Sequence, residues 1–135
     1  MAPIFADRIL KGVPMTIFGD GEQTRDFVSL ADVAAANLAA AVTPGVSGVF
    51  NIGSGSRITI NELSRVMQEV SGVQVGVECG PQRPVDVRDS LADISAAHAA
   101  FGFAPSVLIG GRGLSEYVTW VAADPLTRAR LEAES

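Results

Sequence analysis

The apolar positions of the chain recur with a helical period in some segments and form short runs in others, which predicts helices that alternate with strands. Apolar residues at positions 4, 5, 9 and 10, followed by a glycine, predict a short helix over residues 3–11. The next apolar run, Met15–Phe18, is typical of a strand. Ser29 and Asp32 have the spacing of a capping box for an Ala-rich helix that runs to Val42. Because small residues surround this helix nearly completely, we expect it to be heavily buried.

The middle of the chain continues this alternation. The continuous apolar run of residues 48–53 predicts a parallel strand covered on both faces. Thr59 and Glu62 form a full capping box, and the helix that it opens is expected to end at Gly72. Apolar and polar residues alternate over positions 73–77, which predicts a half-buried strand.

Two further helices are predicted near the end of the chain. Asp93 is expected to cap a helix that Gly102 ends. The inner face of the last helix is expected to consist of Leu114, Tyr117, Val118 and Val121. The alternation of strands and helices predicts the α/β class. We expect residues 1–124 to form the folded segment and residues 125–135 to be a charged tail, frayed or disordered.

Composition narrows the classes of function. A length of 135 residues predicts one domain, and 10 basic against 15 acidic residues give a net charge of −5. This balance argues against a protein that coats a nucleic acid, although one or two arginines still suffice for a small anionic ligand. The mean hydropathy of +0.30 argues against disorder and is high for a lone domain of this size.

The chain lacks the residues of several familiar sites and signals. Cys79 is the only cysteine, so no internal disulfide forms, and a reducing cytoplasm fits best. With one cysteine and one histidine, a structural zinc site is not expected. The N-terminus does not have the pattern of a signal peptide, and the apolar stretch Val33–Val42 is too short to span a bilayer.

Common catalytic motifs are also missing. His98 is interpreted as a partly buried helix residue, and Cys79 as an inert structural residue. The turn Gly53-Ser-Gly55 lacks the third glycine of a dinucleotide fingerprint and the lysine of a Walker loop. We interpret it as a tight turn, although the free backbone N–H groups of the capped helix beyond it could face an anion.

Two polar segments carry more information. In the first, a glycine turn after Phe18 places Arg25 and Asp26 at the start of the next apolar segment. In the second, Pro84 stiffens the chain between Arg83 and Asp86. Two arginines and an aspartate suit a nucleoside diphosphate, because guanidinium groups bind phosphate oxygens and a carboxylate binds ribose hydroxyls. The alternative is that both segments are solvated surface loops.

These segments resemble a known family. The runs Ile-Phe-Gly-Asp-Gly-Glu-Gln-Thr-Arg-Asp-Phe-Val, Val-Phe-Asn-Ile-Gly-Ser-Gly and Arg-Pro-Val-Asp-Val-Arg occur here in the order typical of the NAD-dependent epimerase/dehydratase family. The runs Phe5-Ala-Asp-Arg-Ile-Leu-Lys-Gly and Ala-Asp-Ile-Ser fit the same order, and the resemblance extends from about residue 3 to about residue 121. The chain resembles the C-terminal, substrate-binding part of these extended short-chain dehydrogenases, especially UDP-glucose 4-epimerase-like members, without most of the Rossmann sheet.

The resemblance implies roles for four residues. Arg25 and Arg83 would contact the pyrophosphate of a UDP-sugar or related nucleotide sugar, Asp86 would contact the ribose, and Phe18 would line the base slot. Asn51 would lie on the last strand of the dinucleotide-binding sheet. The chain departs from the family pattern at Val85, where the family has glycine, and at Ser29, Ala31 and the run Gly110-Gly111-Arg112. No metal site is implied.

The resemblance also implies NAD as the cofactor of the full-length family, yet we expect none to bind this chain alone. The family needs a Gly-rich βαβ unit and a Tyr-x-x-x-Lys pair, whereas the only tyrosine here is Tyr117 and the only lysine is Lys11. We therefore expect the chain alone to be inactive, with apolar surface uncovered, and to need a separate N-terminal half or to self-associate.

Two alternatives stay open: a non-catalytic binding or interaction module that keeps the scaffold, and a truncated product. The sugar, the choice among epimerase, dehydratase and decarboxylase, the oligomeric state and whether Met1 is the true start also stay open.

Overall fold

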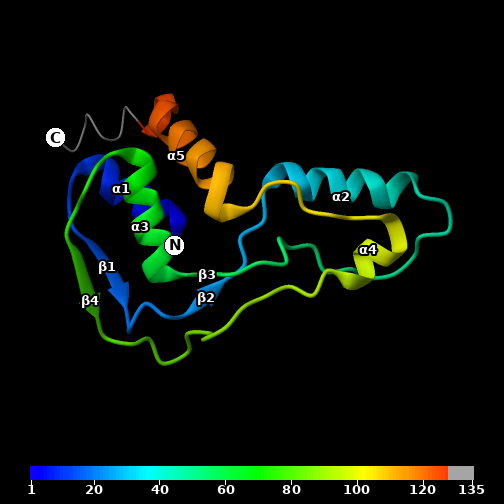
Figure 1. Cartoon of the computed structure of the whole chain (residues 1–135), viewed down its shortest axis with the longest axis horizontal. Helices are drawn as coiled ribbons and strands as arrows, with labels where there is room; N and C mark the ends of the chain where they lie inside the picture. Colours follow the sequence, from blue (N-terminus) through cyan, green and yellow to red (C-terminus); the bar gives the residue numbers. More distant parts are fainter. Residues whose placement is uncertain (128–135) are drawn as a thin grey trace. The chain divides into compact units, whose positions relative to one another are not determined.

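The computed structural model describes residues 1–127, which form two compact units (Figure 1). The first unit comprises residues 1–23, residues 59–87 and the chain from Leu114 onward. The second comprises residues 24–58 and 88–113. Length alone predicts one domain, but each unit collects its own core from stretches that are distant in sequence.

The first unit packs three helices with a two-stranded parallel sheet. Its elements are α1 (Ala2–Lys11), β1 (Met15–Phe18), α3 (Ile60–Ser71), β4 (Val77–Gly80) and α5 (Leu114–Ala123). Strand β1 pairs with β4 in a register that runs from Met15 opposite Val77 to Phe18 opposite Gly80. Helix α3 contacts both α1 and α5, as Figure 1 shows. The side chains buried in this unit include Phe5, Ile9, Met15, Ile17, Ile60, Leu63, Met67, Leu114 and Val118.

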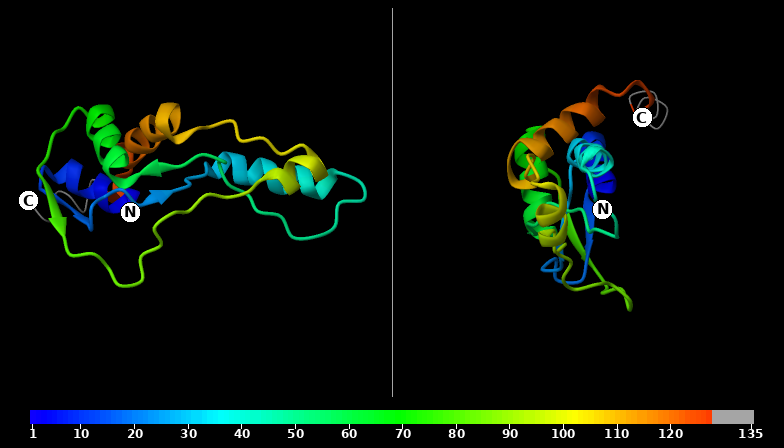
Figure 2. Two further views of the ribbon diagram at one scale, coloured as in Figure 1. Left: turned by 60° about the horizontal axis from the view of Figure 1, so that its bottom comes forward. Right: turned by 90° about the vertical axis from the view of Figure 1, so that its right-hand side faces the viewer.

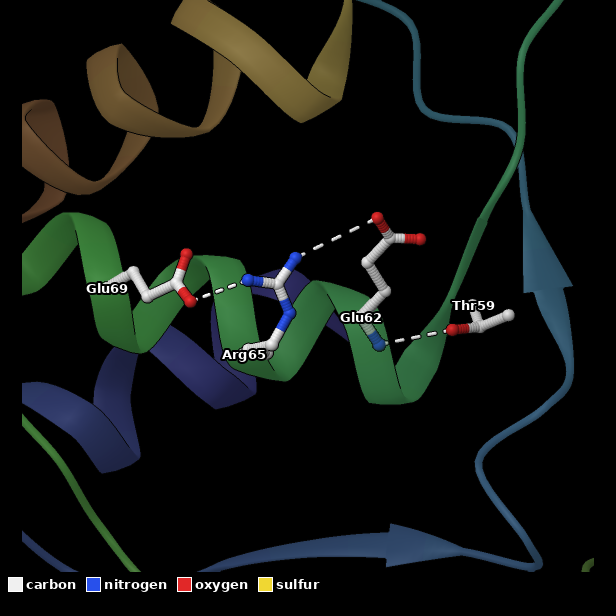
Figure 3. A network of polar contacts seen from close by, with 4 residues as sticks. All are labelled: Thr59, Glu62, Arg65 and Glu69. Carbon is white, nitrogen blue, oxygen red and sulfur yellow. Dashed lines mark hydrogen bonds and ion pairs between the residues drawn. The ribbon is translucent and has the colours of Figure 1, made fainter.

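The helix boundaries of this unit follow the predicted caps. Gly12 ends α1 and Gly72 ends α3, both with left-handed backbones at φ 66° and 70°. The Thr59 hydroxyl accepts a hydrogen bond from the Glu62 N–H at 3.1 Å, as Figure 3 shows. The Glu62 carboxylate faces Arg65 at 3.9 Å. The side chain of Glu62 therefore takes part in a surface ion pair along the helix.

The second unit is built around two helices. Its elements are β2 (Thr24–Arg25), α2 (Leu30–Val42), the first residue of β3 (Ile58–Thr59), α4 (Ser95–Phe101) and a π-helical turn η1 (Ile109–Gly113). Strands β2 and β3 pair in a short sheet. Helices α2 and α4 lie side by side (Figure 2) and share a core in which Ala36, Ala97 and Phe103 are buried. Gly102 ends α4 as predicted, but the N-cap is Ile94 rather than Asp93, because α4 begins at Ser95. The Asp93 carboxylate accepts the Ser95 N–H at 3.0 Å.

The prediction of a strand over residues 48–53 is wrong. Within the described residues this segment pairs with no other strand, and a strand needs a neighbour for its backbone hydrogen bonds. Its side chains nevertheless contribute to the core, because Phe50 and Ile52 pack against the cluster between α2 and α4. The Phe50 and Phe101 rings meet edge to face, with centroids 5.2 Å apart.

The prediction that the Ala-rich helix is heavily buried is also wrong for this chain. Only Asp32 and Ala36 of α2 are buried, while Leu30, Leu38 and Val42 are 83%, 65% and 68% exposed. The described part of the unit covers only one face of the helix. This exposure agrees with the expectation that the chain leaves apolar surface uncovered.

The acidic residue of the predicted capping box in α2 has a different partner. The Ser29 hydroxyl accepts the Ala31 N–H at 3.2 Å, which caps the helix. The buried Asp32 carboxylate instead accepts the N–H and hydroxyl of Ser106 at 3.0 and 2.7 Å and the N–H of Val107 at 3.1 Å. Asp32 therefore anchors the segment before η1 to α2.

The strand predicted over residues 73–77 lies further along the chain. The Val75 N–H donates to the Gln68 side chain at 2.8 Å, and β4 begins at Val77 because β1 pairs there. In the predicted tail, the Asp124 carboxylate accepts the N–H and hydroxyl of Thr127 at 2.8 and 2.9 Å, and residues 125–127 are helical. Residues 128–135 lie outside the described residues. In the described part of the chain, no helix combines the length and the apolar character that crossing a membrane requires.

Candidate functional site

The glycine turn after β1 is fixed against the first turn of α3. The buried Gln23 side chain donates to the Phe18 carbonyl oxygen at 2.8 Å. The Asn61 N–H donates to the Gly21 carbonyl at 3.0 Å, and the Asn61 side-chain amide donates to the Asp20 carbonyl at 2.9 Å and to Glu22 at 2.6 Å. Gly21 has a φ of +75°, and a Cβ there would overlap the Asn61 side chain. The turn therefore holds the end of β1 in one position.

Phe18 and Arg83 form a stacked pair at the carboxyl end of the parallel sheet. Arg83 Cζ lies 4.1 Å from the centroid of the Phe18 ring. Phe18 is the last residue of β1 and lies opposite Gly80, the last residue of β4. A Cβ at Gly80 would come within 3.0 Å of the ring, so the glycine gives the ring room. Ligands of α/β sheets bind beyond the carboxyl ends of strands, where this pair lies.

The stacked geometry suits anion binding. A guanidinium group that stacks through its face keeps its N–H donors in the plane of the group, directed outward from its edge. The Phe18 ring therefore orients Arg83 without using the donors that bind phosphate in a bidentate manner. The Arg83 side chain is exposed, so these donors are within reach of a ligand.

Asp86 is joined to Arg83 by a turn. The Asp86 N–H donates to the Arg83 carbonyl at 3.3 Å, with Pro84 at the position of a β-turn where its fixed φ fits best. Among the described residues no residue other than glycine has a positive φ, so Val85 fits this turn without strain. The departure from glycine at position 85 therefore leaves the turn intact. Asp86 is half-buried.

Arg25 belongs to the other unit. It is the second residue of β2, it is half-buried, and its Nη1 donates to the Thr24 carbonyl at 2.7 Å. Phe18, Arg83 and Asp86 all belong to the first unit. The structure thus brings three of the four predicted binding residues into one unit, and the participation of Arg25 in the same site stays a prediction.

Asp26 binds the glycine turn that sequence analysis linked to anion binding. Its carboxylate accepts the N–H and hydroxyl of Ser54 at 2.8 and 2.6 Å, the Gly55 N–H at 3.2 Å and the Ala92 N–H at 3.1 Å. Burial raises the pKa of the Asp26 carboxyl, but the Ser54 hydroxyl and these three N–H groups outweigh it, so its pKa lies below the ordinary value of 3.8. The anion at this turn is therefore a side chain of the protein itself.

The expectation that the N-terminus of α3 offers free N–H groups is wrong. The Ile60 N–H donates to the Gln23 carbonyl at 3.2 Å, the Asn61 N–H to Gly21 and the Glu62 N–H to the Thr59 hydroxyl. The turn after β1 supplies two of these acceptors. A helix N-terminus satisfied in this way has no donors left for a phosphate.

The remaining candidates for chemistry lie on the surface. His98 is exposed on α4 rather than partly buried, and Cys79 is exposed on β4. The described residues contain no group of three or more histidine, cysteine, aspartate or glutamate side chains that could hold a metal ion. Sequence reasoning missed Asn61 and the anchoring role of Asp26, because only the fold brings their partners together.

Comparisons with known proteins connect this geometry to a family. Residues 1–53 match the model of the NAD dependent epimerase/dehydratase family. A curated putative UDP-glucose 4-epimerase of Methanocaldococcus jannaschii is 35% identical over 118 residues, which are 87% of this chain and 37% of that protein.

Solved structures agree with this relationship. The UDP-glucose 4-epimerase of Thermotoga maritima with UDP-glucose is 38% identical, with a TM-score of 0.82 over 90% of this chain and 38% of that one. The UDP-N-acetylglucosamine 4-epimerase of Methanobrevibacter ruminantium in complex with UDP-N-acetylmuramic acid is 35% identical, with a TM-score of 0.84 over 91% of this chain and 39% of that one. The chain thus spans less than two fifths of the length of these relatives.

Proposed function

Because the chain belongs to the NAD dependent epimerase/dehydratase family, we propose that it is the C-terminal, sugar-nucleotide-binding segment of such an enzyme. A UDP-glucose 4-epimerase-like protein is the best single assignment. The observation that carries the proposal is the Arg83 guanidinium stacked on Phe18 at the carboxyl ends of β1 and β4. The Thermotoga maritima relative, solved with UDP-glucose, supports a uridine nucleotide as the ligand.

Each proposed contact uses a chemical property of its side chain. Arg83 binds the pyrophosphate through the edge of its guanidinium, and Asp86 accepts hydrogen bonds from the ribose hydroxyls. The Phe18 segment lines the base slot, where an aromatic ring offers apolar surface. Arg25, from the second unit, supplies a second guanidinium for the pyrophosphate.

The residues of this chain do not fit NAD as a resident cofactor. The chain has no Gly-rich dinucleotide fingerprint, and the N–H groups of Ser54, Gly55 and the start of α3, which could otherwise face a phosphate, are bonded to the protein itself. Tyr117 and Lys11 cannot form the Tyr-x-x-x-Lys pair of the family. We therefore assign no hydride chemistry to this chain alone, and we assign NAD binding to the part of the family that this chain does not span.

The exposed apolar side chains of the second unit are a candidate surface for a covering partner. Leu38 and Val42 of α2 and the 99% exposed Val49 present apolar side chains to solvent. We propose that a separate N-terminal half of the family fold, or a second copy of the chain, covers them.

Calorimetric titration tests the binding site. We expect UDP and UDP-glucose to bind the wild-type chain, and Arg83→Ala and Arg25→Ala to weaken binding by roughly tenfold or more, as expected for loss of a charge-assisted hydrogen bond. Arg65→Ala is the matched control, because Arg65 is an exposed arginine of the first unit that pairs with Glu62 and Glu69 on α3 (Figure 3).

Two results would count against the proposal. UDP binding that is insensitive to both Arg83→Ala and Arg25→Ala would refute the site. A well-folded monomer that binds neither UDP nor UDP-glucose would favour the non-catalytic interaction module instead.

A further inference from the structure

A polar bridge in the second unit connects three stretches of chain around Thr24. The Thr24 hydroxyl donates to Asp89 Oδ1 at 2.9 Å, and Arg57 Nη1 lies 3.6 Å from the same oxygen. The Thr24 N–H donates to the Arg88 carbonyl at 2.9 Å. Arg57 directly precedes Ile58, the first residue of β3, the strand that pairs with β2. Asp89 thus ties together β2, the approach to β3 and the chain that follows Arg88.

Thr24 transmits this arrangement to Arg25. Thr24 is buried, and its hydroxyl, N–H and carbonyl oxygen are all used in hydrogen bonds. Its carbonyl oxygen accepts the Arg25 Nη1 at 2.7 Å. The Arg25 guanidinium is therefore held by the Thr24 peptide group, and the position of that peptide group depends on the Asp89 bridge.

The ion pair between Arg57 and Asp89 adds little to the stability of the fold by itself. The side chains of Arg57 and Asp89 are 55% and 61% exposed, and ion pairs that water reaches contribute little to folding. A geometric role and a purely stabilising role therefore lead to different expectations when the bridge is removed.

We propose that Asp89 is a positioning residue, which holds Arg25 through Thr24 in the orientation that binds the diphosphate of the ligand. The inference rests on the proposed function, in which Arg25 contacts the pyrophosphate. It adds Asp89, Thr24 and Arg57 to the determinants of phosphate recognition, although none of them touches the ligand.

The test compares two probes, UDP and uridine, by calorimetry on the full chain. We expect Asp89→Ala, which removes the acceptor of the Thr24 hydroxyl, to weaken UDP binding by about fivefold, near the low end of coupling between residues of one network, and to leave uridine binding unchanged. In an Arg25→Ala background, Asp89→Ala should have no further effect on UDP binding. Arg57→Gln, which removes the other charge of the bridge, should give a smaller loss of the same kind.

The control and the opposing outcomes separate positioning from stability. Asp93→Ala removes another exposed carboxylate of the second unit, which accepts the Ser95 N–H at the start of α4, and should leave UDP binding unchanged. An equal loss of UDP and uridine binding, or the same loss with and without Arg25, would overturn the inference in favour of a structural role. Unchanged UDP binding by both Asp89→Ala and Arg57→Gln would overturn it as well. A folded wild-type chain that binds no UDP would overturn the proposed function and this inference together.

Discussion

The substitution Asp26→Asn removes charge from a carboxylate that is surrounded entirely by donors. Oδ1 accepts the N–H and hydroxyl of Ser54, and Oδ2 accepts the N–H groups of Gly55 and Ala92. An asparagine side chain has one acceptor oxygen and one amide group, so either orientation turns an N–H₂ group toward two donors. The substitution therefore breaks about half of the contacts without changing the size of the side chain.

The magnitude follows from the orphaned donors. A buried donor without a partner costs about 1–3 kcal/mol, and water can satisfy part of this demand at a half-buried site. We expect Asp26→Asn to lower the free energy of unfolding by about 2–3 kcal/mol at neutral pH. Gly53 increases the sensitivity of the site, because it lies so close to Asp26 and Ala92 that the turn has little room to readjust.

The pH dependence has a defined sign. Because the pKa of Asp26 is lower in the folded chain than its ordinary value of 3.8, its contribution is fully present above that value. The contribution is lost as the pH falls through the folded-state pKa. We therefore expect the difference in unfolding free energy between the wild type and Asp26→Asn to narrow below about pH 4.

Denaturant unfolding and amide hydrogen exchange provide the assay. The Ser54, Gly55 and Ala92 amides should exchange faster in Asp26→Asn, whereas Asp93→Asn, at an exposed carboxylate with a local acceptor role, should leave them unchanged. Equal unfolding free energies at pH 7, together with unchanged exchange at these three amides, would refute the reasoning.

Two further substitutions test the fixed turn and the helix that holds it. Gly21→Ala should destabilise the first unit by more than about 1 kcal/mol, because the φ of +75° and the contact with Asn61 both oppose a Cβ, and thermal unfolding measures this. A Gly21→Ala chain that is as stable as wild type would show that the turn is free to move. Thr59→Ala should lower the free energy of unfolding by about 1 kcal/mol through loss of the cap on Glu62 N–H, while Thr59→Ser retains the acceptor and most of the stability. Equal losses in both variants would show that the hydroxyl is not the cause.

The sequence predicted the helices well because their signals are local. The caps at Thr59, Gly72 and Gly102 depend on neighbours within a few residues, and the structure confirms each of them. Strands depend on hydrogen-bonded partners. The local sequence pattern could not reveal that residues 48–53 lack such a partner among the described residues. In the same way, β4 begins at Val77 because pairing with β1 decides its position, while the alternation of residues 73–77 is a local pattern only.

The residues of the candidate site could be predicted from local motifs, but their contacts could not. Resemblance pointed to Phe18, Arg83 and Asp86 as separate motifs, but the stack of Arg83 on Phe18 depends on the register of β1 and β4. The anchoring roles of Asp26 and Asp32 were out of reach, because the donors they accept come from chain segments far along the sequence. A carboxylate that organises distant backbone amides leaves no periodic trace in the sequence.

Each of the two units is built from segments that alternate along the sequence, and this arrangement affects folding during synthesis. The core of the first unit includes Phe5 near the N-terminus and Leu114 and Val118 near the other end. Since α5 contacts both α1 and α3, a nascent chain released from the ribosome residue by residue keeps this core incomplete until α5 has emerged. A premature stop codon after residue 113 would therefore expose the side chains of α1 and α3 that contact α5, while every residue of the second unit would already have been synthesised.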